Sequence, residues 1–319
     1  MPHDSLSTAP PPVRPHSSER PLGPDDPDVV GGYTLLGRLG EGGQGVVYLG
    51  RDSGGGLVTV KLLRGGAAAA QRARSRFVKE AAAARQVTGR HTARILDADV
   101  TGDRPYIVSE FVEGPSLQHV VADRGPLPTP RLRKVALRTA GALAAVHRAG
   151  IVHRDFKPGN VLLGPDGAKV IDFGIAQMAD ATPLTTGPVG TPAYMAPEQI
   201  EDEPVGPPAD VFAWGATMVY AATGRPPFGT GSNAAVMRRV TSRRPDLGDM
   251  EGPLRELVAR CLDKNPAARP TARQLVRALR DDMVPAPKPK PTRIPPYRWR
   301  MMVALAGVVV AGFMLGVLI

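Results

Sequence analysis

Three chemically capable side chains fall within one short segment of the sequence. The segment HRDFKPGN, residues 153–160, holds the carboxylate of Asp155, the ammonium of Lys157 and the amide of Asn160. A Pro-Gly pair interrupts any helix between the last two, so we predict a loop. A carboxylate can accept a proton, an ammonium can neutralise an anion and an amide oxygen can bind a metal. The same residues would also suit a solvated turn, so this segment alone leaves both interpretations open.

A glycine-rich stretch lies about a hundred residues earlier. Gly40, Gly42 and Gly45 have the spacing G-x-G-x-x-G, which is weak by itself because glycine-rich turns are common. In a dinucleotide-binding fold a helix would start at these glycines. Here the strand-like sequence VVYLG follows. This order favours a hairpin whose backbone closes over phosphate groups.

Three further charged residues occupy positions that suit phosphate chemistry. Lys61 ends the apolar strand VTVK, and Glu80 lies on the following helix-like segment, where it could pair with that lysine. Asp172 ends the apolar run VID before Phe-Gly, and a carboxylate there could hold Mg²⁺. Taken singly, they could be an edge lysine, a surface helix charge and a turn aspartate. The tripeptide APE, residues 196–198, follows a loop that is rich in threonine.

The order and spacing of these pieces match the protein-kinase signature set, which is one of the standard motif sets. From about residue 33 to residue 282, the sequence resembles the eukaryotic-like (Hanks-type) serine/threonine kinases of bacteria. The resemblance implies an α+β, bilobal protein-kinase fold over residues 31–283, with a β-rich N-lobe (31–113) and a larger helical C-lobe (114–283). The Ala-, Gly-, Arg- and Pro-rich composition is typical of actinobacterial proteins.

The resemblance also implies roles for individual residues. Asp155 would orient the substrate hydroxyl and take its proton, Lys157 would offset charge on the γ-phosphoryl group, and Lys61 would be oriented by Glu80. The metal, Mg²⁺ or alternatively Mn²⁺, would be held by Asn160 and Asp172. The residues implied to contact ATP are Leu39, Gly40, Gly42, Gly45, Val47, Lys61, Glu110, Val112, Asn160 and Asp172.

The pattern favours transfer of the γ-phosphate of ATP to serine or threonine hydroxyls of proteins. Lys157 follows Asp155 by two residues, and GTPAYMAPE, residues 190–198, resembles the substrate-side segment of serine/threonine kinases. The alternative is a membrane-anchored pseudokinase or scaffold that binds ATP without turnover. Pseudokinases usually lack at least one key residue of the motif set, whereas all five are present here: Lys61, Glu80, Asp155, Asn160 and Asp172.

Two positions depart from the family pattern. Position 59 is usually Ala and is Thr here, and position 109, just before the hinge, is often large and is Ser here. Our hypothesis is that the two changes compensate each other by letting the adenine shift inward.

Regulatory and structural positions also follow from the resemblance. Arg154 would bind a phosphate on the activation loop, with Thr185 and Thr186 as the best acceptors. These threonines could also be ordinary loop residues. Glu198 is implied to pair with Arg269, and Asp210 to begin a buried helix.

The elements that must position these residues can be read from the hydrophobic periodicity. We predict strands in residues 33–63 and in ARILDADV and PYIVSEFV, and a helix over 72–87. The predicted C-lobe helices span residues 131–149, 208–223, 232–242, 253–262 and 271–282. Residues 1–30 are rich in Pro, Ser and Asp, and we predict a disordered tail without a secretory signal.

The amino-acid composition argues against several classes of site and function. The single cysteine, Cys261, excludes an intrachain disulfide and a cysteine metal cluster, and its apolar neighbours predict a core thiol. The formal net charge is +10, but it is dispersed, and the chain has only two Trp, six Tyr and seven Phe. We therefore do not expect nucleic-acid binding.

The C-terminal region predicts a membrane anchor. Residues 284–300 form a Pro-rich linker with five basic residues and no acid, and residues 301–319 contain no charge. A helix of that length spans about 28 Å, close to a bilayer core of about 30 Å. The basic flank predicts a single-pass protein of the cell membrane with a cytoplasmic kinase domain. Gly312 and Gly316 have a spacing that permits a homodimer.

Overall fold

The computed structural model describes residues 20–42, 45–63, 82–99, 102, 104–173 and 191–283. The described residues up to Asp281 belong to one compact unit. The predictions for the tail before residue 20, for Glu80, for Thr185 and Thr186, and for residues 284–319 lie outside the described residues.

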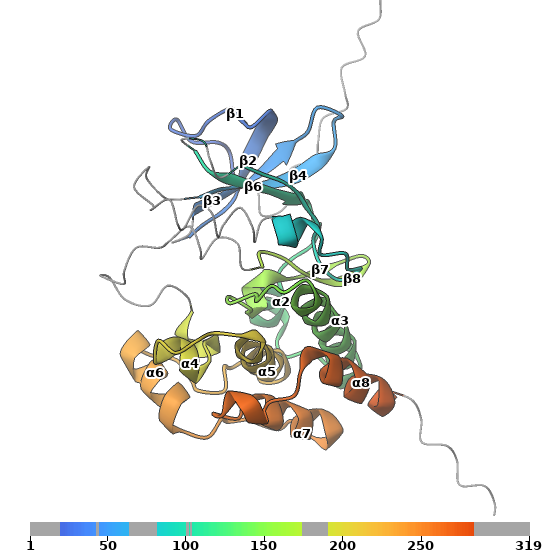
Figure 1. The fold of residues 1–319 in the computed structure, drawn as a ribbon, viewed down its shortest axis with the longest axis vertical. Helices are drawn as coiled ribbons and strands as arrows, with labels where there is room; N and C mark the ends of the chain where they lie inside the picture. The colour runs from blue at the N-terminus through green and yellow to red at the C-terminus, as the bar shows by residue number, and fades with distance from the viewer. Residues whose placement is uncertain are drawn as a thin grey trace, which may run out of the picture. The chain divides into compact units, whose positions relative to one another are not determined.

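The small lobe is a six-stranded sheet with the order β1-β2-β3-β4-β6-β5, coloured blue to teal in Figure 1. Each neighbouring pair is antiparallel. Both faces of β4 (LVTVKLL) carry buried side chains. Val58 and Val60 pack in the small-lobe core, whereas Leu63 points to the opposite face and belongs to a second cluster. The strands are β1 (Val29–Val30), β2 (Tyr33–Gly42), β3 (Gly45–Arg51), β4 (Leu57–Leu63), β5 (Ile95–Asp99) and β6 (Tyr106–Glu110).

Residues 20–30 are ordered, so the prediction of a disordered tail up to residue 30 was wrong for this stretch. Arg20 and Arg38 exchange two backbone hydrogen bonds of 2.9 and 2.8 Å, and β1 pairs with β2. Val30 is buried, and Leu22 packs against the same small-lobe core. The composition of the segment predicts disorder, but a few apolar side chains and backbone pairing along β2 fix it.

The larger lobe is helical, as predicted, and begins after a connection between β6 and α2. It carries one β7–β8 hairpin beside the small lobe (Figure 1). Its elements are α2 (Leu117–Arg124), α3 (Thr129–Arg148), η1 (Pro158–Asn160), β7 (Val161–Gly164), β8 (Gly167–Val170), η3 (Pro192–Tyr194), α4 (Pro197–Ile200), α5 (Pro207–Thr223), α6 (Asn233–Ser242), α7 (Gly252–Cys261), η4 (Pro266–Ala268) and α8 (Ala272–Met283).

Helix α5 is the centre of this lobe. It is apolar on nearly every face, which is typical of a helix surrounded by others. Its Trp214 is fully buried, and the indole N–H donates to Thr139 Oγ1 of α3 at 2.9 Å. Cys261 is also fully buried, as predicted, and burial raises the pKa of its thiol. The core thus fixes α3 and α5. The segment that carries Asp155, Lys157 and Asn160 lies between these two helices in the sequence.

A second group of buried side chains joins the two lobes. Leu63 and Ile107 of the small lobe share one cluster with Val146, Ile151 and Phe173 of the larger lobe. Phe173 directly follows Asp172, so its burial fixes the place where that carboxylate emerges. This shared core makes the position of one lobe's site residues depend on the other lobe.

Within the described ranges, we find no helix both long and apolar enough to cross a bilayer. Residues 301–319, for which the sequence predicts a membrane helix, are not among them.

Candidate active site

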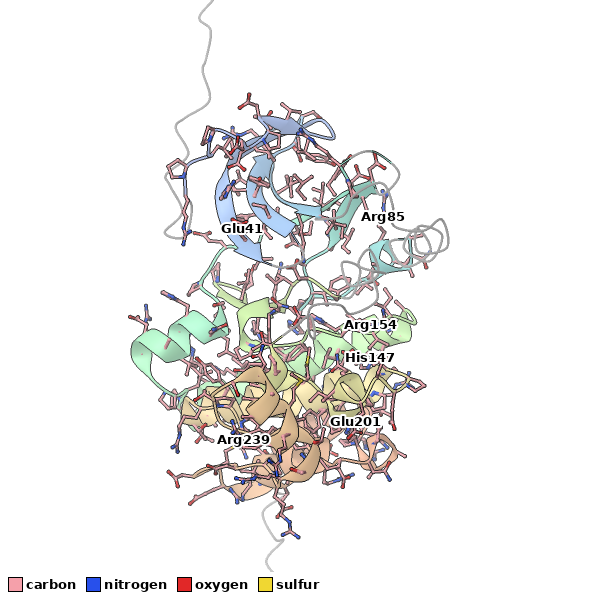
Figure 2. All side chains as sticks on the ribbon, turned by 90° about the vertical axis from the view of Figure 1, so that its left-hand side faces the viewer. Glu41, Arg85, His147, Arg154, Glu201 and Arg239 are labelled. Carbon is pink, nitrogen blue, oxygen red and sulfur yellow. The ribbon has the colours of Figure 1, made fainter. Side chains whose placement is uncertain are left out.

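The glycine-rich stretch forms a hairpin between β2 and β3, as predicted, rather than a strand-to-helix turn. Gly42 pairs with Gly45 at the last described positions before the tip. Gly45 has φ +146°, and a Cβ there would lie 2.0 Å from the Leu62 carbonyl oxygen, so only glycine fits. Figure 2 shows Glu41 at the end of the small lobe that is nearest the helical lobe. The described end of this hairpin strand therefore lies on the side of the small lobe that faces the helical lobe.

A buried carboxylate fixes the first strand of this hairpin. Asp26 accepts hydrogen bonds from Arg38 Nε and Nη2 at 2.6 and 2.7 Å, from Tyr48 Oη at 2.6 Å and from Gly23 N–H at 2.7 Å. The Arg38 guanidinium holds the pKa of Asp26 well below its usual range, and burial raises the pKa of Tyr48 to about 12. Arg38 also contacts Glu41 Oε2 at 3.3 Å. The chain before residue 33 thus supports the strand that leads into the hairpin.

Lys61 and Asp172 meet across the two lobes. Lys61 lies on β4 and is buried, and its Nζ is 3.3 Å from Asp172 Oδ2. Asp172 has φ +56°, a left-handed backbone that residues with a Cβ rarely adopt and that often marks a functional site. The structure therefore brings together two residues that are 111 positions apart in the sequence.

The segment HRDFKPGN, residues 153–160, is a loop in which three polar side chains lie close together. Lys157 Nζ is 2.7 Å from Asp155 Oδ2, and Asn160 Nδ2 donates to the Asp155 carbonyl oxygen at 2.8 Å and to Oδ2 at 3.3 Å. The side chain of Asp155 is 16% exposed, so substrate can still reach the carboxylate. Because the amide nitrogen of Asn160 faces Asp155, its amide oxygen points elsewhere and can bind a cation.

The Asp210 side chain holds the backbone of this loop in place through hydrogen bonds. Its buried carboxylate accepts from the N–H groups of His153 and Arg154 at 2.7 and 2.8 Å, and lies 2.7 Å from His147 Nε2. Arg154 has φ +63°, and the Asp155 N–H donates to the His153 carbonyl at 2.8 Å, which closes a three-residue turn. Asp210 lies in the first turn of α5, as the resemblance implied.

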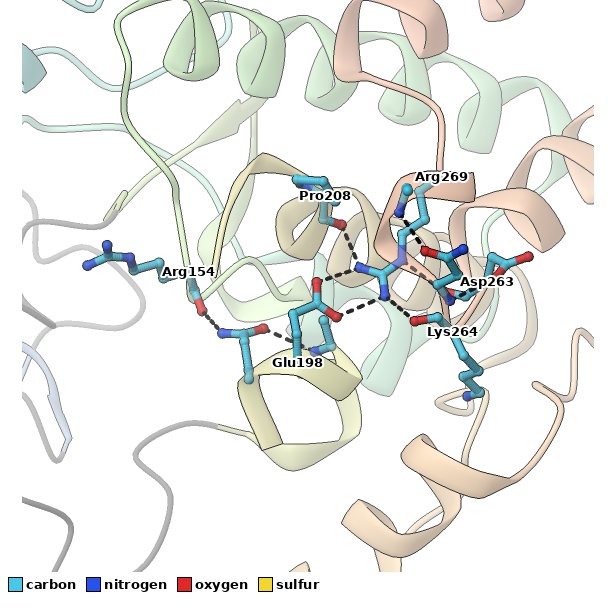
Figure 3. Close-up of polar contacts among 10 residues, drawn as sticks. Arg154, Glu198, Pro208, Asp263, Lys264 and Arg269 are labelled. Carbon is cyan, nitrogen blue, oxygen red and sulfur yellow. Dashed lines mark hydrogen bonds and ion pairs between the residues drawn. The ribbon is translucent and has the colours of Figure 1, made fainter. Parts of the chain in front are cut away.

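Glu198 and Arg269 form the predicted ion pair, shown in Figure 3. Arg269 Nη1 and Nη2 contact the two carboxylate oxygens at 2.7 and 2.9 Å. The Glu198 side chain is 4% exposed and the Arg269 side chain is 0% exposed. Arg269 makes three more hydrogen bonds, to the carbonyls of Pro208, Asp263 and Lys264. The pair therefore anchors α4, at the end of the substrate-side segment, to the C-lobe.

Four of the residues implied to contact ATP lie on the strands of the small lobe or in the connection that follows them. Leu39 and Val47 lie on β2 and β3, where Val47 pairs with the neighbouring Gly40. The Glu110 side chain contacts Lys169, and Val112 lies in the connection after β6.

The two departures from the family pattern face each other. Thr59 of β4 and Ser109 of β6 are paired directly in the sheet register, and both side chains are partly buried. Side chains that are opposite one another on adjacent strands lie close together on the same face. A change at one position therefore acts on the space at the other.

Sequence reasoning missed several residues that shape the site. His147 and Gln199 support the loop through partners that are far away in sequence. His153 lies in the loop and contacts the distant Ile171 carbonyl, and Asp26 lies in a stretch predicted to be disordered. The signal for Gln199 was present in APEQ, because Gln at the third helical position is typical of a capping box. Arg154 lies beside Asp155, as expected, and Figure 2 shows it in the helical lobe.

The comparisons with known proteins point in one direction. The protein kinase domain family matches residues 33–279. The chain is 44% identical over 264 residues to the Thermomonospora curvata protein named "Probable serine/threonine-protein kinase PkwA", covering 82% of this chain and 36% of that protein. It is 42% identical over 257 residues to the serine/threonine-protein kinase AfsK of Streptomyces coelicolor, covering 80% and 32%. The chain thus spans about a third of the length of these relatives.

A solved structure shares the fold. The kinase domain of Mycobacterium tuberculosis PknI aligns with a TM-score of 0.60 at 26% identity, covering 79% of this chain and 96% of that domain.

Proposed function

The chain belongs to the protein kinase domain family, and on that premise we propose that it is an ATP-dependent serine/threonine protein kinase. The observation that carries the proposal is a pair of charged clusters whose segments are joined by the Ile171 N–H donating to the Asn160 carbonyl at 3.0 Å. Lys61 meets Asp172 at 3.3 Å, and Asp155 meets Lys157 at 2.7 Å within a loop held by buried groups. These charged groups, with the Asn160 amide beside Asp155, support phosphoryl transfer as the reaction. The serine/threonine kinases PkwA and AfsK support the substrate class.

The proposed reaction needs alignment and charge neutralisation more than covalent help. The oxygen of a substrate Ser or Thr attacks the γ-phosphorus of ATP, and the bond from that phosphorus to the bridging oxygen of ADP breaks. Asp155 orients the hydroxyl and accepts its proton, and Lys157 offsets the negative charge of the transferred group. Lys61 binds the α- and β-phosphates. The hairpin between β2 and β3 covers the phosphates with backbone.

The residues present fit a magnesium ion. Asp172 supplies a carboxylate and Asn160 an amide oxygen, and hard oxygen donors of this kind suit Mg²⁺. Among the described residues, no group of three or more His, Cys, Asp or Glu side chains could hold a metal alone. This agrees with a site in which nucleotide phosphates supply further ligands, and Mn²⁺ could take the same place. The ion would neutralise charge on the phosphate oxygens.

Activation-loop phosphorylation is part of the proposal. Arg154 presents a guanidinium beside the catalytic loop, and guanidinium groups bind phosphate through paired, charge-assisted hydrogen bonds. Phosphate on Thr185 or Thr186 would order the substrate side of the site. If mass spectrometry finds no phosphate on residues 175–190 of active protein, this part of the proposal fails.

Anchoring in the cell membrane is proposed from the sequence alone. The uncharged residues 301–319 and the basic linker before them suit a single span with the kinase domain in the cytoplasm. Release of the full chain from membranes by alkaline carbonate would contradict this. A homodimer through Gly312 and Gly316 would weaken when Gly312→Ile is tested in a membrane two-hybrid assay, and an unchanged signal would count against it.

The function is tested by asking which residues receive phosphate. The full chain is incubated with γ-labelled ATP, Mg²⁺ and a pool of Ser-, Thr- and Tyr-containing peptides, and the labelled amino acids are identified. We expect phosphoserine and phosphothreonine. Phosphotyrosine alone would refute the substrate class, and bound ATP without any labelled product would favour the scaffold alternative.

A further inference from the structure

The placement of the proposed base depends on one residue with an unusual backbone. Arg154 has φ +63°, and it lies between His153 and Asp155, whose backbone groups are joined at 2.8 Å. A left-handed backbone is unfavourable for a residue with a side chain, and it persists only where the surroundings hold it. The position of the Asp155 carboxylate therefore depends on what holds Arg154.

Both backbone polar groups of Arg154 are held by side chains. Its N–H donates to Asp210 Oδ1 at 2.8 Å, and its carbonyl accepts from Gln199 Nε2 at 2.9 Å. The first partner belongs to the buried helix α5, and the second to α4. The turn is thus fixed from two independent elements of the C-lobe.

The orientation of the Gln199 amide is set by a second contact. Its Oε1 accepts from the Ala196 N–H at 3.0 Å, and an N–H group requires an oxygen there. The NH₂ group must then face the Arg154 carbonyl, which requires a donor. A flipped amide would place its NH₂ group against the Ala196 N–H and its oxygen against the Arg154 carbonyl. Both contacts therefore specify the same orientation.

The helix that carries Gln199 is itself rigidly anchored. The preceding residue, Glu198, binds Arg269 through both carboxylate oxygens inside the C-lobe. Figure 3 shows this arrangement, with the Arg154 carbonyl linked to the same turn of chain that carries Glu198. A fixed helix therefore presents the amide to the loop that holds Asp155.

We propose that Gln199 is a positioning residue, which couples the substrate-side helix α4 to the catalytic loop and holds Asp155 in place through Arg154. The inference rests on the proposed kinase function. It goes beyond the capping of α4, because capping uses only Oε1 whereas positioning uses Nε2. The two roles can be separated chemically.

Gln199→Glu separates them, because a carboxylate still accepts from the Ala196 N–H but presents an oxygen to the Arg154 carbonyl. Gln199→Ala removes both contacts. Gln274→Glu is the matched control, because Gln274 Oε1 caps α8 in the same way, accepting from the Thr271 N–H at 2.8 Å, far from the loop in sequence. All variants are made in the full chain.

We expect kcat for a Ser/Thr peptide to fall about tenfold to a hundredfold in Gln199→Glu and Gln199→Ala, as small misplacements of catalytic groups cause. The KM for ATP should change less than twofold, and Gln274→Glu should match wild type. Lowering the pH from about 8 to about 6 should partly restore Gln199→Glu relative to wild type, but not Gln199→Ala, because a protonated Glu can donate to the Arg154 carbonyl.

Hydrogen exchange gives a readout that does not require activity. The amide of Asp155 should exchange faster in both Gln199 variants and be unchanged in Gln274→Glu. Wild-type kcat and wild-type exchange in the Gln199 variants would overturn the inference while leaving the proposed function intact. An inactive wild type would overturn the proposed function, and the exchange result would still decide the inference.

Discussion

The buried pair of Arg269 and Glu198 allows a quantitative prediction. We consider Arg269→Met, which keeps much of the side-chain length and removes all five N–H donors. In the folded protein each of these donors has a partner: Nη1 and Nη2 bind both Glu198 oxygens, and the remaining three N–H groups bind backbone carbonyls. The Arg269 side chain is 0% exposed, so water cannot replace it.

The expected loss follows from what the substitution leaves behind. The Glu198 carboxylate stays buried without its counter-charge, and the carbonyls of Pro208, Asp263 and Lys264 each lose a donor. Removing one partner of a buried ion pair costs about 3–5 kcal/mol. At about 2–4 °C per kcal/mol for a domain of this size, Tm should fall by roughly 6–20 °C. Arg269→Lys should fall in between, because an ammonium keeps the charge but cannot bind both oxygens in parallel.

The assay is thermal unfolding of the full chain, monitored by circular dichroism. Arg277→Met is the matched control, because Arg277 lies on α8 and its side chain is 86% exposed. Its Nε lies 3.9 Å from Asp281 Oδ2, which makes a long, exposed ion pair. Exposed pairs contribute about 0–1 kcal/mol, so this variant should lose little. A fall in Tm for Arg269→Met no larger than for Arg277→Met would refute the reasoning.

Two further predictions concern the small lobe. Because the Arg38 guanidinium lowers the pKa of Asp26, the stability that this carboxylate contributes is fully present above its unfolded pKa of about 4. It is lost progressively as the pH falls from there through the lower pKa of the folded protein. Asp26→Asn should therefore lower Tm by several degrees at pH 7 and flatten the loss in acid, and an unchanged Tm–pH curve would contradict this. At the paired positions, Ser109→Met should raise the KM for ATP roughly fivefold or more by overpacking. Adding Thr59→Ala to that variant should reverse much of the increase in KM. Unchanged KM values in both single variants would exclude compensation.

The sequence was sufficient for those parts of the site that depend on local pattern. Apolar alternation marked β4 and therefore Lys61, and the strand-like residues after the glycines correctly indicated a hairpin. The loop at Asp155 was recognisable because the Pro-Gly pair disfavours an α-helix, and the structure has only the short 3-10 turn η1 there. These features need only a few neighbouring residues to be specified.

The features that were missed depend on distant partners. Asp26 is held by side chains 12 and 22 positions away, and Gln199 bonds a carbonyl 45 positions away. A Pro- and Asp-rich stretch has the composition of a disordered tail, and only the β2 backbone and Arg38 give it a fixed place. Composition reports what a segment can bury by itself, whereas these contacts depend on where the fold places another segment.

The central claim is that Asp155 and its loop perform phosphoryl transfer. The most direct test is a single-turnover measurement with γ-labelled ATP and a Ser/Thr peptide, comparing the wild-type chain with Asp155→Asn while nucleotide affinity is measured on the same samples. We predict that the variant binds ATP as tightly as wild type and transfers phosphate about 10²–10⁴-fold more slowly. Equal transfer rates in the two proteins, with equal ATP binding, would contradict the assignment of Asp155 as the base.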